Sequence, residues 1–127
     1  MSTLAGITLD TGALIALERG TGPLSRRMKR VHEVGVRVTV PAVVLIEWWR
    51  AGFGRRHRDI LAPMYVEPTT QRIARAAGEA LITTRASAVD AAGMASAALR
   101  GDVVFTSDLD DLGQLQADFS TVRLFGV

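Results

Sequence analysis

The chain has 127 residues, the length of one domain, and is large enough to bury a core without disulfides or a structural metal. It contains no cysteine, which excludes disulfide frameworks, thiolate zinc sites and cysteine nucleophiles. A hydrophobic content of 48% with 22% charged residues excludes a disordered chain, and the formal net charge is only +2.

The first six residues show no basic stretch followed by an apolar core, and no apolar run approaches membrane-spanning length. We therefore expect residues 1–127 to form a single cytoplasmic domain without a membrane partner. The positive charge comes from 14 arginines and one lysine, Lys29. Arginine suits phosphate binding, although a solvated surface also explains most of these residues.

The first predicted elements are a strand at 6–9 and a helix at 13–18, with Asp10 between them. Asp10 fits an N-cap, because its carboxylate can accept backbone N–H bonds, and it also lies where a strand end presents functional groups. A second helix begins at Pro23 and ends before Gly35. Its basic residues fit either a solvated face or an RNA contact, and they are Arg26, Arg27, Lys29 and Arg30.

A strand at 37–40 precedes Pro41 and an apolar helix at 42–50. Glu47 has apolar neighbours on both sides, so its carboxylate needs a partner or a metal unless it faces solvent or pairs with Arg50. Trp48 and Trp49 cannot both face one core. We expect at least one of the two at a protein interface.

The segment 52–59 is predicted to be a flexible and strongly basic loop. Its Arg55, Arg56 and Arg58 are the best phosphate-contacting candidates outside the acidic residues, although the segment also fits a solvated loop. A short helical turn at 60–64 and an extended piece at 65–68 come next. Thr69 or Thr70 then caps another helix.

An Ala-rich helix at 88–100 contains Asp90 near its start and ends at Gly101, a residue that readily takes the left-handed conformation after a helix. The β-branched and aromatic run that follows leads into Thr106 and Asp108. A helix at 109–119 and a strand at 121–125 complete the chain. This order predicts an α/β fold, with a parallel central β-sheet flanked by helices on both faces.

Acidic residues recur at the ends of these elements, where a doubly wound sheet gathers its ligands. They are Asp10, Glu47, Asp90, Asp108 and Asp110. A set of oxygen ligands without His or Cys suits Mg²⁺ or Mn²⁺, which are held by a few carboxylates together with waters and phosphate oxygens.

Four segments in this order resemble the PIN domain and, within it, the VapC-type toxins of bacterial toxin–antitoxin pairs. They are residues 9–17, 40–47, 89–92 and 104–112, and the resemblance covers the whole chain. It implies a single PIN-like domain over residues 1–127. The acidic metal ligands that it implies are Asp10, Glu47, Asp90 and Asp108, with Asp110 as an accessory acid and Thr106 as a supporting hydroxyl. Asp111 competes with Asp110 for the accessory role, since both closely follow Asp108.

The resemblance implies a Mg²⁺- or Mn²⁺-dependent endoribonuclease that is inhibited by a cognate VapB-type antitoxin and is commonly a homodimer. The residues support this chemistry, because carboxylates that hold a divalent ion can lower the pKa of a bound water and position it for attack on an RNA phosphodiester. Gly12 stands where many relatives carry a small hydroxyl residue, and Gly93 interrupts the Asp90 helix. Neither departure removes a metal ligand.

Other classes lack the residues that they need. A receiver domain uses a lysine near its C-terminal strands, whereas the only lysine here is Lys29. A metal-free ribonuclease would need His32 and His57, and we expect both at the surface. The remaining alternative is a catalytically silent PIN-like module that binds RNA or a protein, whose mark would be the loss of an acidic ligand.

Overall fold

A parallel sheet forms the centre of the computed structural model, which describes residues 5–20 and 22–127. The expectations for Met1–Leu4 and for Thr21 lie outside these residues. Five strands lie in the order β3-β2-β1-β4-β5, and each neighbouring pair is parallel. Their bounds are β1 (Ile7–Leu9), β2 (Val38–Pro41), β3 (Tyr65–Glu67), β4 (Val103–Thr106) and β5 (Arg123–Gly126).

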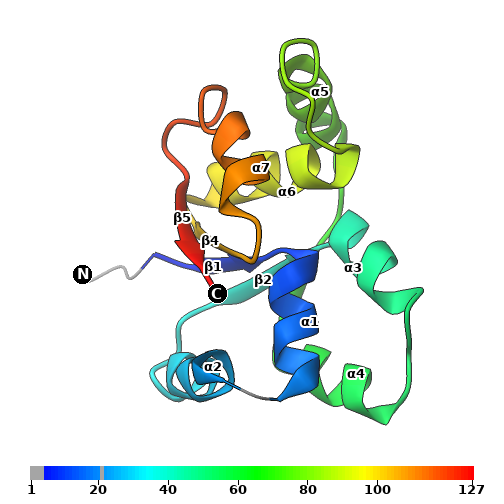
Figure 1. The fold of residues 1–127 in the computed structure, drawn as a ribbon, viewed down its shortest axis with the longest axis vertical. Coiled ribbons are helices and arrows are strands. Elements are labelled where there is room, and N and C mark those ends of the chain that lie inside the picture. Colours follow the sequence, from blue (N-terminus) through cyan, green and yellow to red (C-terminus); the bar gives the residue numbers. More distant parts are fainter. Residues whose placement is uncertain (1–4, 21) are drawn as a thin grey trace.

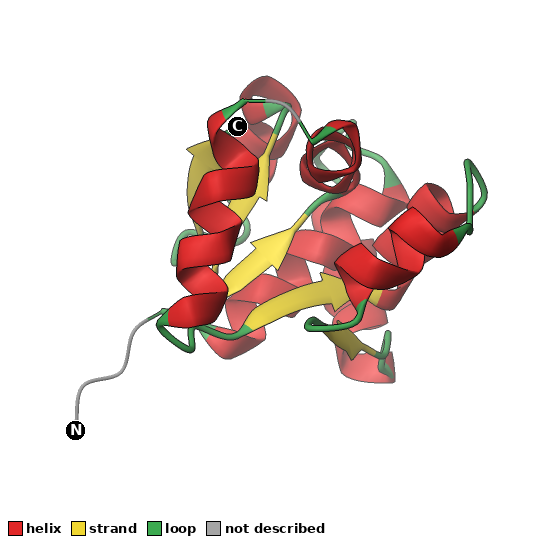
Figure 2. Cartoon of the chain, turned by 90° about the horizontal axis from the view of Figure 1, so that it is seen from below, coloured by secondary structure: helices red, strands yellow, loops and turns green. Residues whose placement is uncertain are grey.

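Helices cover both faces of the sheet, as the sequence predicts (Figure 1). In the described part of the chain they are α1 (Thr11–Arg19), α2 (Pro23–Glu33), α3 (Ala42–Trp49), α4 (Arg55–Leu61), α5 (Gln71–Ala80), α6 (Ala88–Arg100) and α7 (Leu109–Leu115). Figure 1 shows α1, α2 and α4 below the sheet and α5, α6 and α7 above it. Figure 2 shows the same strands from below, lying between the helices. Within the described residues, no helix has both the length and the apolar character that crossing a membrane requires.

The protein has two hydrophobic cores, one on each face of the sheet. Leu9 and Phe105 belong to the core under α1 and α2, whereas Val104 belongs to the core under α5, α6 and α7. Successive side chains of a strand point to opposite faces, so β4 and β5 contribute to both cores. Strands β1 and β2 contribute apolar side chains only to the core under α1 and α2.

Local signals predict several helix ends correctly. The Thr70 hydroxyl accepts a hydrogen bond from the Ile73 amide at the start of α5. At the end of α6, Gly101 takes a left-handed conformation with φ of 71°. A side chain at that φ would be strained, which explains why a glycine ends the helix.

The predicted loop at 52–59 is wrong, because residues from Arg55 onward form α4. His57 lies inside the fold at 7% exposure, with its ring centroid 4.5 Å from that of Trp48, so its predicted surface position is also wrong. His32 is half-buried. The segment 52–59 contains two glycines and three arginines and has no apolar periodicity, so its sequence does not indicate a helix.

Other boundaries also differ from the sequence predictions. Of the helical turn expected at 60–64, only residues 60 and 61 belong to a helix, the end of α4. Helix α7 ends at Leu115 instead of residue 119, and β5 begins at Arg123 instead of residue 121. Turns therefore occupy more of the chain between these two elements than the residue pattern indicates. The Gln116 amide group donates a hydrogen bond to the Val122 carbonyl at 3.1 Å, which closes this connection.

Candidate active site

Asp10 lies directly after β1 and caps α1. Its Oδ1 accepts a hydrogen bond from the Ala13 amide at 2.8 Å, so the N-cap expected for this residue is present. The Asp10 amide donates to the Phe105 carbonyl of β4 at 3.2 Å. The carboxyl ends of β1 and β4 therefore meet at Asp10, as expected for neighbouring parallel strands.

Asp108 lies beside this junction, after β4. The fully buried Thr106 hydroxyl accepts a hydrogen bond from the Asp108 amide at 2.8 Å. Asp108 caps α7 by accepting from the Asp111 amide at 3.0 Å. A hydrogen bond between the Asp111 and Asp108 carboxyl groups raises the pKa of Asp111. Asp111 thus contacts Asp108, and the assignment of the accessory role to Asp110 or Asp111 stays a prediction.

Glu47 is half-buried on α3, where its Oε1 accepts a hydrogen bond from the Thr11 hydroxyl of α1. The sequence suggests solvent or Arg50 as partners, and it does not indicate Thr11. Because Thr11 follows Asp10, this contact holds α3 against the start of α1. It thereby brings the Glu47 carboxylate to the same edge of the sheet.

Asp90 lies in the first turn of α6, where its amide donates to the Ser87 hydroxyl at 3.0 Å. Asp10 and Asp90 border one narrow cavity of about 10 Å³, whose lining includes Thr8 and Val104. A cavity of this size has room for about one water molecule. It is too small to enclose a hydrated ion.

The carboxylates influence one another electrostatically. Burial raises the pKa of Asp10, and the negative charges of Asp108 and Glu47 raise it further, although the Thr106 hydroxyl and the Ala13 amide lower it. Burial also raises the pKa of Asp90, with added contributions from the charges of Asp10, Glu47 and Asp111. Asp10 and Asp108, which follow β1 and β4, therefore form one acidic site with Glu47 on α3 and Asp90 on α6.

The donor chemistry of this site fits a divalent metal ion. Within residues 5–20 and 22–127, no three acidic or histidine side chains are grouped closely enough to hold one ion as they stand. Three of the carboxylates instead accept hydrogen bonds from the Ala13 amide, the Thr11 hydroxyl and the Asp111 amide. An oxygen-only ligand set with mutual repulsion is nevertheless the environment that Mg²⁺ or Mn²⁺ neutralises.

Several solved structures match almost the whole chain. A chain of VapBC2 from Rickettsia felis, solved bound to a promoter DNA fragment, has a TM-score of 0.75 at 10% identity, covering 95% of this chain and 98% of that chain. DNA-bound VapBC from Salmonella typhimurium gives a TM-score of 0.71 at 18% identity, covering 97% and 98%. The chain has the PIN-like fold of VapC structures.

A third match is VapC20 from Mycobacterium tuberculosis, which is described as a sarcin-ricin loop cleaving toxin. Its TM-score is 0.63 at 24% identity, covering 93% of this chain and 99% of that chain. Neither a family model nor a curated protein sequence matches this chain. The likeness therefore establishes the PIN-like fold, whereas function depends on the residues of the site.

Gly12 and Ser107 lie against each other in this PIN-like fold. A Cβ atom added at Gly12 would overlap Ser107 Oγ and come within 2.8 Å of Ser107 Cβ. The same position is 3.5 Å from Asp10 Oδ1. The Ser107 hydroxyl thus occupies the space beside Asp10 that a side chain at position 12 would fill. The residue pattern does not assign Ser107 to the site. Only the tertiary structure shows that the Ser107 side chain lies where a side chain at position 12 would lie.

The predicted RNA-binding arginines lie on α4, away from the carboxylates. Arg55 and Arg58 are exposed, and Arg55 faces Asp59 at 3.8 Å. Arg56 donates to the Leu17 carbonyl at 3.0 Å and so binds the last turn of α1. A helix of nine residues is about 13 Å long. The arginine cluster is therefore near the opposite end of α1 from Asp10 (Figure 1).

Proposed function

We propose that this protein is the toxin of a type II toxin–antitoxin pair and acts as a Mg²⁺- or Mn²⁺-dependent endoribonuclease. The observation that carries the proposal is the placement of Asp10 and Asp108 directly after β1 and β4, together with the charge of Glu47, which raises the pKa of both Asp10 and Asp90. A PIN-like fold and the described activity of VapC20 support it. We infer a cytoplasmic location on the same grounds.

These four residues would hold the metal ion. Bound there, a divalent ion supplies a water nucleophile at neutral pH and neutralises charge that develops on the phosphodiester. The protein restrains its carboxylates beforehand, since Asp10 is held by the Ala13 amide and Glu47 by the Thr11 hydroxyl. The Thr106 hydroxyl fixes the backbone of Asp108. Such restraint lowers the reorganisation needed when a phosphate arrives.

A cleavage assay on RNA tests the proposal. We expect purified protein to cut RNA with added Mg²⁺ or Mn²⁺, and we expect no cleavage in excess EDTA. Asp10→Asn removes a metal ligand and should reduce cleavage to background. Glu79→Gln, an exposed change on α5, is the matched control and should cut normally. Cleavage that persists in EDTA, or an active Asp10→Asn variant, contradicts the metal-dependent mechanism.

The catalytically silent alternative gives a different result in the same assay. A PIN-like module that only binds would leave RNA intact with every metal while still retaining it in a gel-shift experiment. The presence of all four acidic residues favours the enzyme. A small neighbouring gene for a DNA-binding antitoxin would further support the toxin assignment.

An apolar surface supports the predicted protein partners. Trp48 is fully buried and donates to Glu18 Oε1 at 2.9 Å. Trp49 is half-buried and packs against the same core, so the expectation that the two tryptophans cannot share one core is wrong. The exposed part of Trp49 remains a candidate for an interface. Trp49 borders a groove of about 450 Å³, in which Ile46 is 68% exposed. We propose that this groove serves the homodimer or the VapB-type antitoxin contact. Ile46→Arg should weaken one of these associations in size-exclusion chromatography, and a dimer and antitoxin complex both unchanged would refute the assignment.

A further inference from the structure

A second surface of the molecule combines positive charge with an apolar lining. A groove of about 430 Å³ follows α2, and we call it the α2 groove. Its lining residues are Pro23, Arg26, Arg27, Arg30, Val31 and Val34. Three guanidinium groups on one helix therefore border a depression that also contains proline and valine side chains. The sequence leaves these arginines open between a solvated face and an RNA contact.

Arg27 is held in place by an aromatic ring. Its guanidinium carbon lies 4.5 Å from the centroid of Phe125 on β5, and the Phe125 ring packs 4.9 Å from that of Phe105. A guanidinium group over an aromatic face is attracted to it and loses part of its freedom. The positive charge of Arg27 is thus directed toward β5 before any ligand binds.

The charges of the α2 groove are largely uncompensated within the described residues. No ion pair joins Arg26 or Arg27 to an acidic side chain there, and the contact of Arg30 with Glu33 spans 3.8 Å between two exposed groups. An exposed pair of this kind contributes little binding energy. The groove therefore retains a net positive charge that an anionic ligand can neutralise.

The groove and the acidic site lie near the same edge of the sheet. Phe125 pairs with Phe105 in the parallel register, and the next pair along these strands joins Gly126 to Thr106. The Thr106 hydroxyl in turn holds the Asp108 amide. Arg27 therefore lies over β5, the neighbour of β4, and β4 leads directly into Asp108.

We propose that the α2 groove binds phosphate groups of the RNA strand that flank the cleavage position. This inference rests on the proposed nuclease function. Arginine presents forked donors that match phosphate oxygens, and the Pro23 and Val31 side chains offer apolar contacts to riboses and bases. A polyanion placed over four carboxylates is repelled, so binding needs positive charge close by. An acidic protein segment would satisfy the arginines but would have no reason to extend over the carboxylates, which favours RNA.

Binding measurements on inactive protein test the groove separately from catalysis. Asp10→Asn serves as the background, and a fluorescent single-stranded RNA that the wild type cuts serves as the probe. We expect Arg26→Ala/Arg27→Ala to weaken binding and to reduce the slope of log K against log salt by about 0.7 for each phosphate that the protein no longer neutralises. Arg72→Ala/Arg75→Ala removes the same charge from exposed positions of α5 and should keep the wild-type slope.

Kinetics of active protein provide a second readout. With the acidic site intact, Arg26→Ala/Arg27→Ala should raise KM while kcat stays near the wild-type value, because the arginines act on binding and not on the reacting atoms. Arg27→Lys should recover part of the loss, since it keeps the charge without the fork. Unchanged salt slopes and KM values for the α2 variants, or equal losses in the α5 control, would overturn the inference.

A failure of the α2 groove inference can be distinguished from a failure of the proposed nuclease function. Wild-type protein that cuts RNA while the α2 variants bind it normally contradicts the groove alone. Wild-type protein that never cuts RNA contradicts the nuclease proposal, whatever the variants do. If poly-glutamate binding depends on Arg26 and Arg27 while RNA binding does not, the groove serves an acidic protein segment and the RNA inference is wrong.

Discussion

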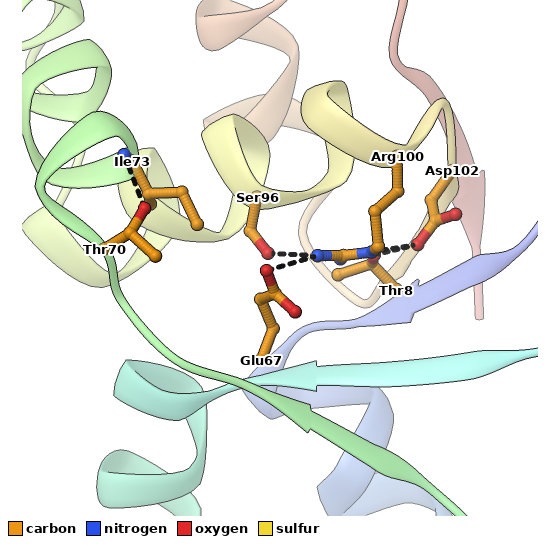
Figure 3. Close-up of polar contacts among 7 residues, drawn as sticks. All are labelled: Thr8, Glu67, Thr70, Ile73, Ser96, Arg100 and Asp102. Atoms are coloured by element: carbon orange, nitrogen blue, oxygen red, sulfur yellow. Dashed lines mark hydrogen bonds and ion pairs between the residues drawn. The ribbon is translucent and has the colours of Figure 1, made fainter.

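The Thr8 hydroxyl donates a hydrogen bond to Asp102 Oδ2 at 2.8 Å, although 94 residues separate the two in the chain. Arg100 completes this contact (Figure 3), donating to Asp102 Oδ2 at 2.9 Å, Thr8 Oγ1 at 2.8 Å and Ser96 Oγ at 2.7 Å. Glu67 of β3 lies 3.9 Å from the same guanidinium group. The network joins β3 to β1, which is followed by Asp10, and to the end of α6, whose first turn contains Asp90.

Arg100→Met should lower the free energy of unfolding by about 3 to 5 kcal/mol, because Asp102 is left buried without its charge partner. Urea denaturation followed by circular dichroism measures the change. Arg72→Met, an exposed arginine on α5, is the matched control and should shift stability by less than about 0.5 kcal/mol. Equal, small effects for both variants would show that the network contributes little.

Asp10→Asn and Asp108→Asn should melt at higher temperature than wild type in EDTA and should no longer cut RNA. Asparagine caps a helix about as well as aspartate, so each change removes charge repulsion and keeps the cap. A free metal concentration of 100 times the dissociation constant would raise the free energy of unfolding of the wild type by about 2.7 kcal/mol. Thermal melting with and without Mn²⁺ measures both effects. If both variants melt lower in EDTA and metal shifts all three proteins equally, these residues are caps without a metal role.

The stability of the metal-free protein should depend on pH through Asp10 and Asp90. Their pKa values are raised above 3.8 in the folded state, so the native protein binds more protons than the unfolded chain between 3.8 and the raised values. These two groups contribute fully to the free energy of unfolding below pH 3.8, and this contribution is lost as the pH rises through their raised pKa values. The stability advantage of Asp10→Asn over wild type should therefore grow with pH. Urea denaturation in EDTA from about pH 3 to about pH 8 measures it, and an advantage that shrinks with pH would contradict the raised pKa.

Gly12→Ala should destabilise the protein by about 1 to 3 kcal/mol, the usual cost of overpacking, because the new methyl group meets Ser107. Ser107→Gly opens that space and should rescue much of the loss in the double variant. A double-mutant cycle in urea isolates the coupling between the two positions. Gly78→Ala on α5 is the control, since nothing lies within 4 Å of a Cβ added there. Additive effects of Gly12→Ala and Ser107→Gly would show that the two positions do not interact.

The α4 arginines should separate into a structural residue and two binding residues. Arg56→Ala removes the hydrogen bond to the Leu17 carbonyl and should lower the free energy of unfolding by about 1 kcal/mol. Arg55→Ala and Arg58→Ala should leave stability unchanged and reduce the salt slope of RNA binding. Thermal melting and RNA titration at several salt concentrations measure both. An unchanged slope for Arg55→Ala/Arg58→Ala would assign these side chains to solvent.

The sequence by itself determined the alternation of strands and helices and the placement of acidic residues at their ends. Asp10, Asp90 and Asp108 could be located because caps, glycine stops and β-branched runs are local signals that extend over a few residues. Parallel connectivity then predicts that the residues after β1 and β4 share one edge of the sheet. For the same reason, the fold class followed from the order of elements alone.

Only the tertiary structure decided which side chains meet. The Thr11 bond to Glu47, the contact of Asp111 with Asp108 and the burial of His57 depend on how helices rotate and pack against one another. The position of Arg27 over Phe125 likewise joins segments almost one hundred residues apart. Such contacts arise from the competition of many weak packing interactions across the whole chain. Local residue patterns contain no information about that competition, because each pattern is compatible with several neighbours in space.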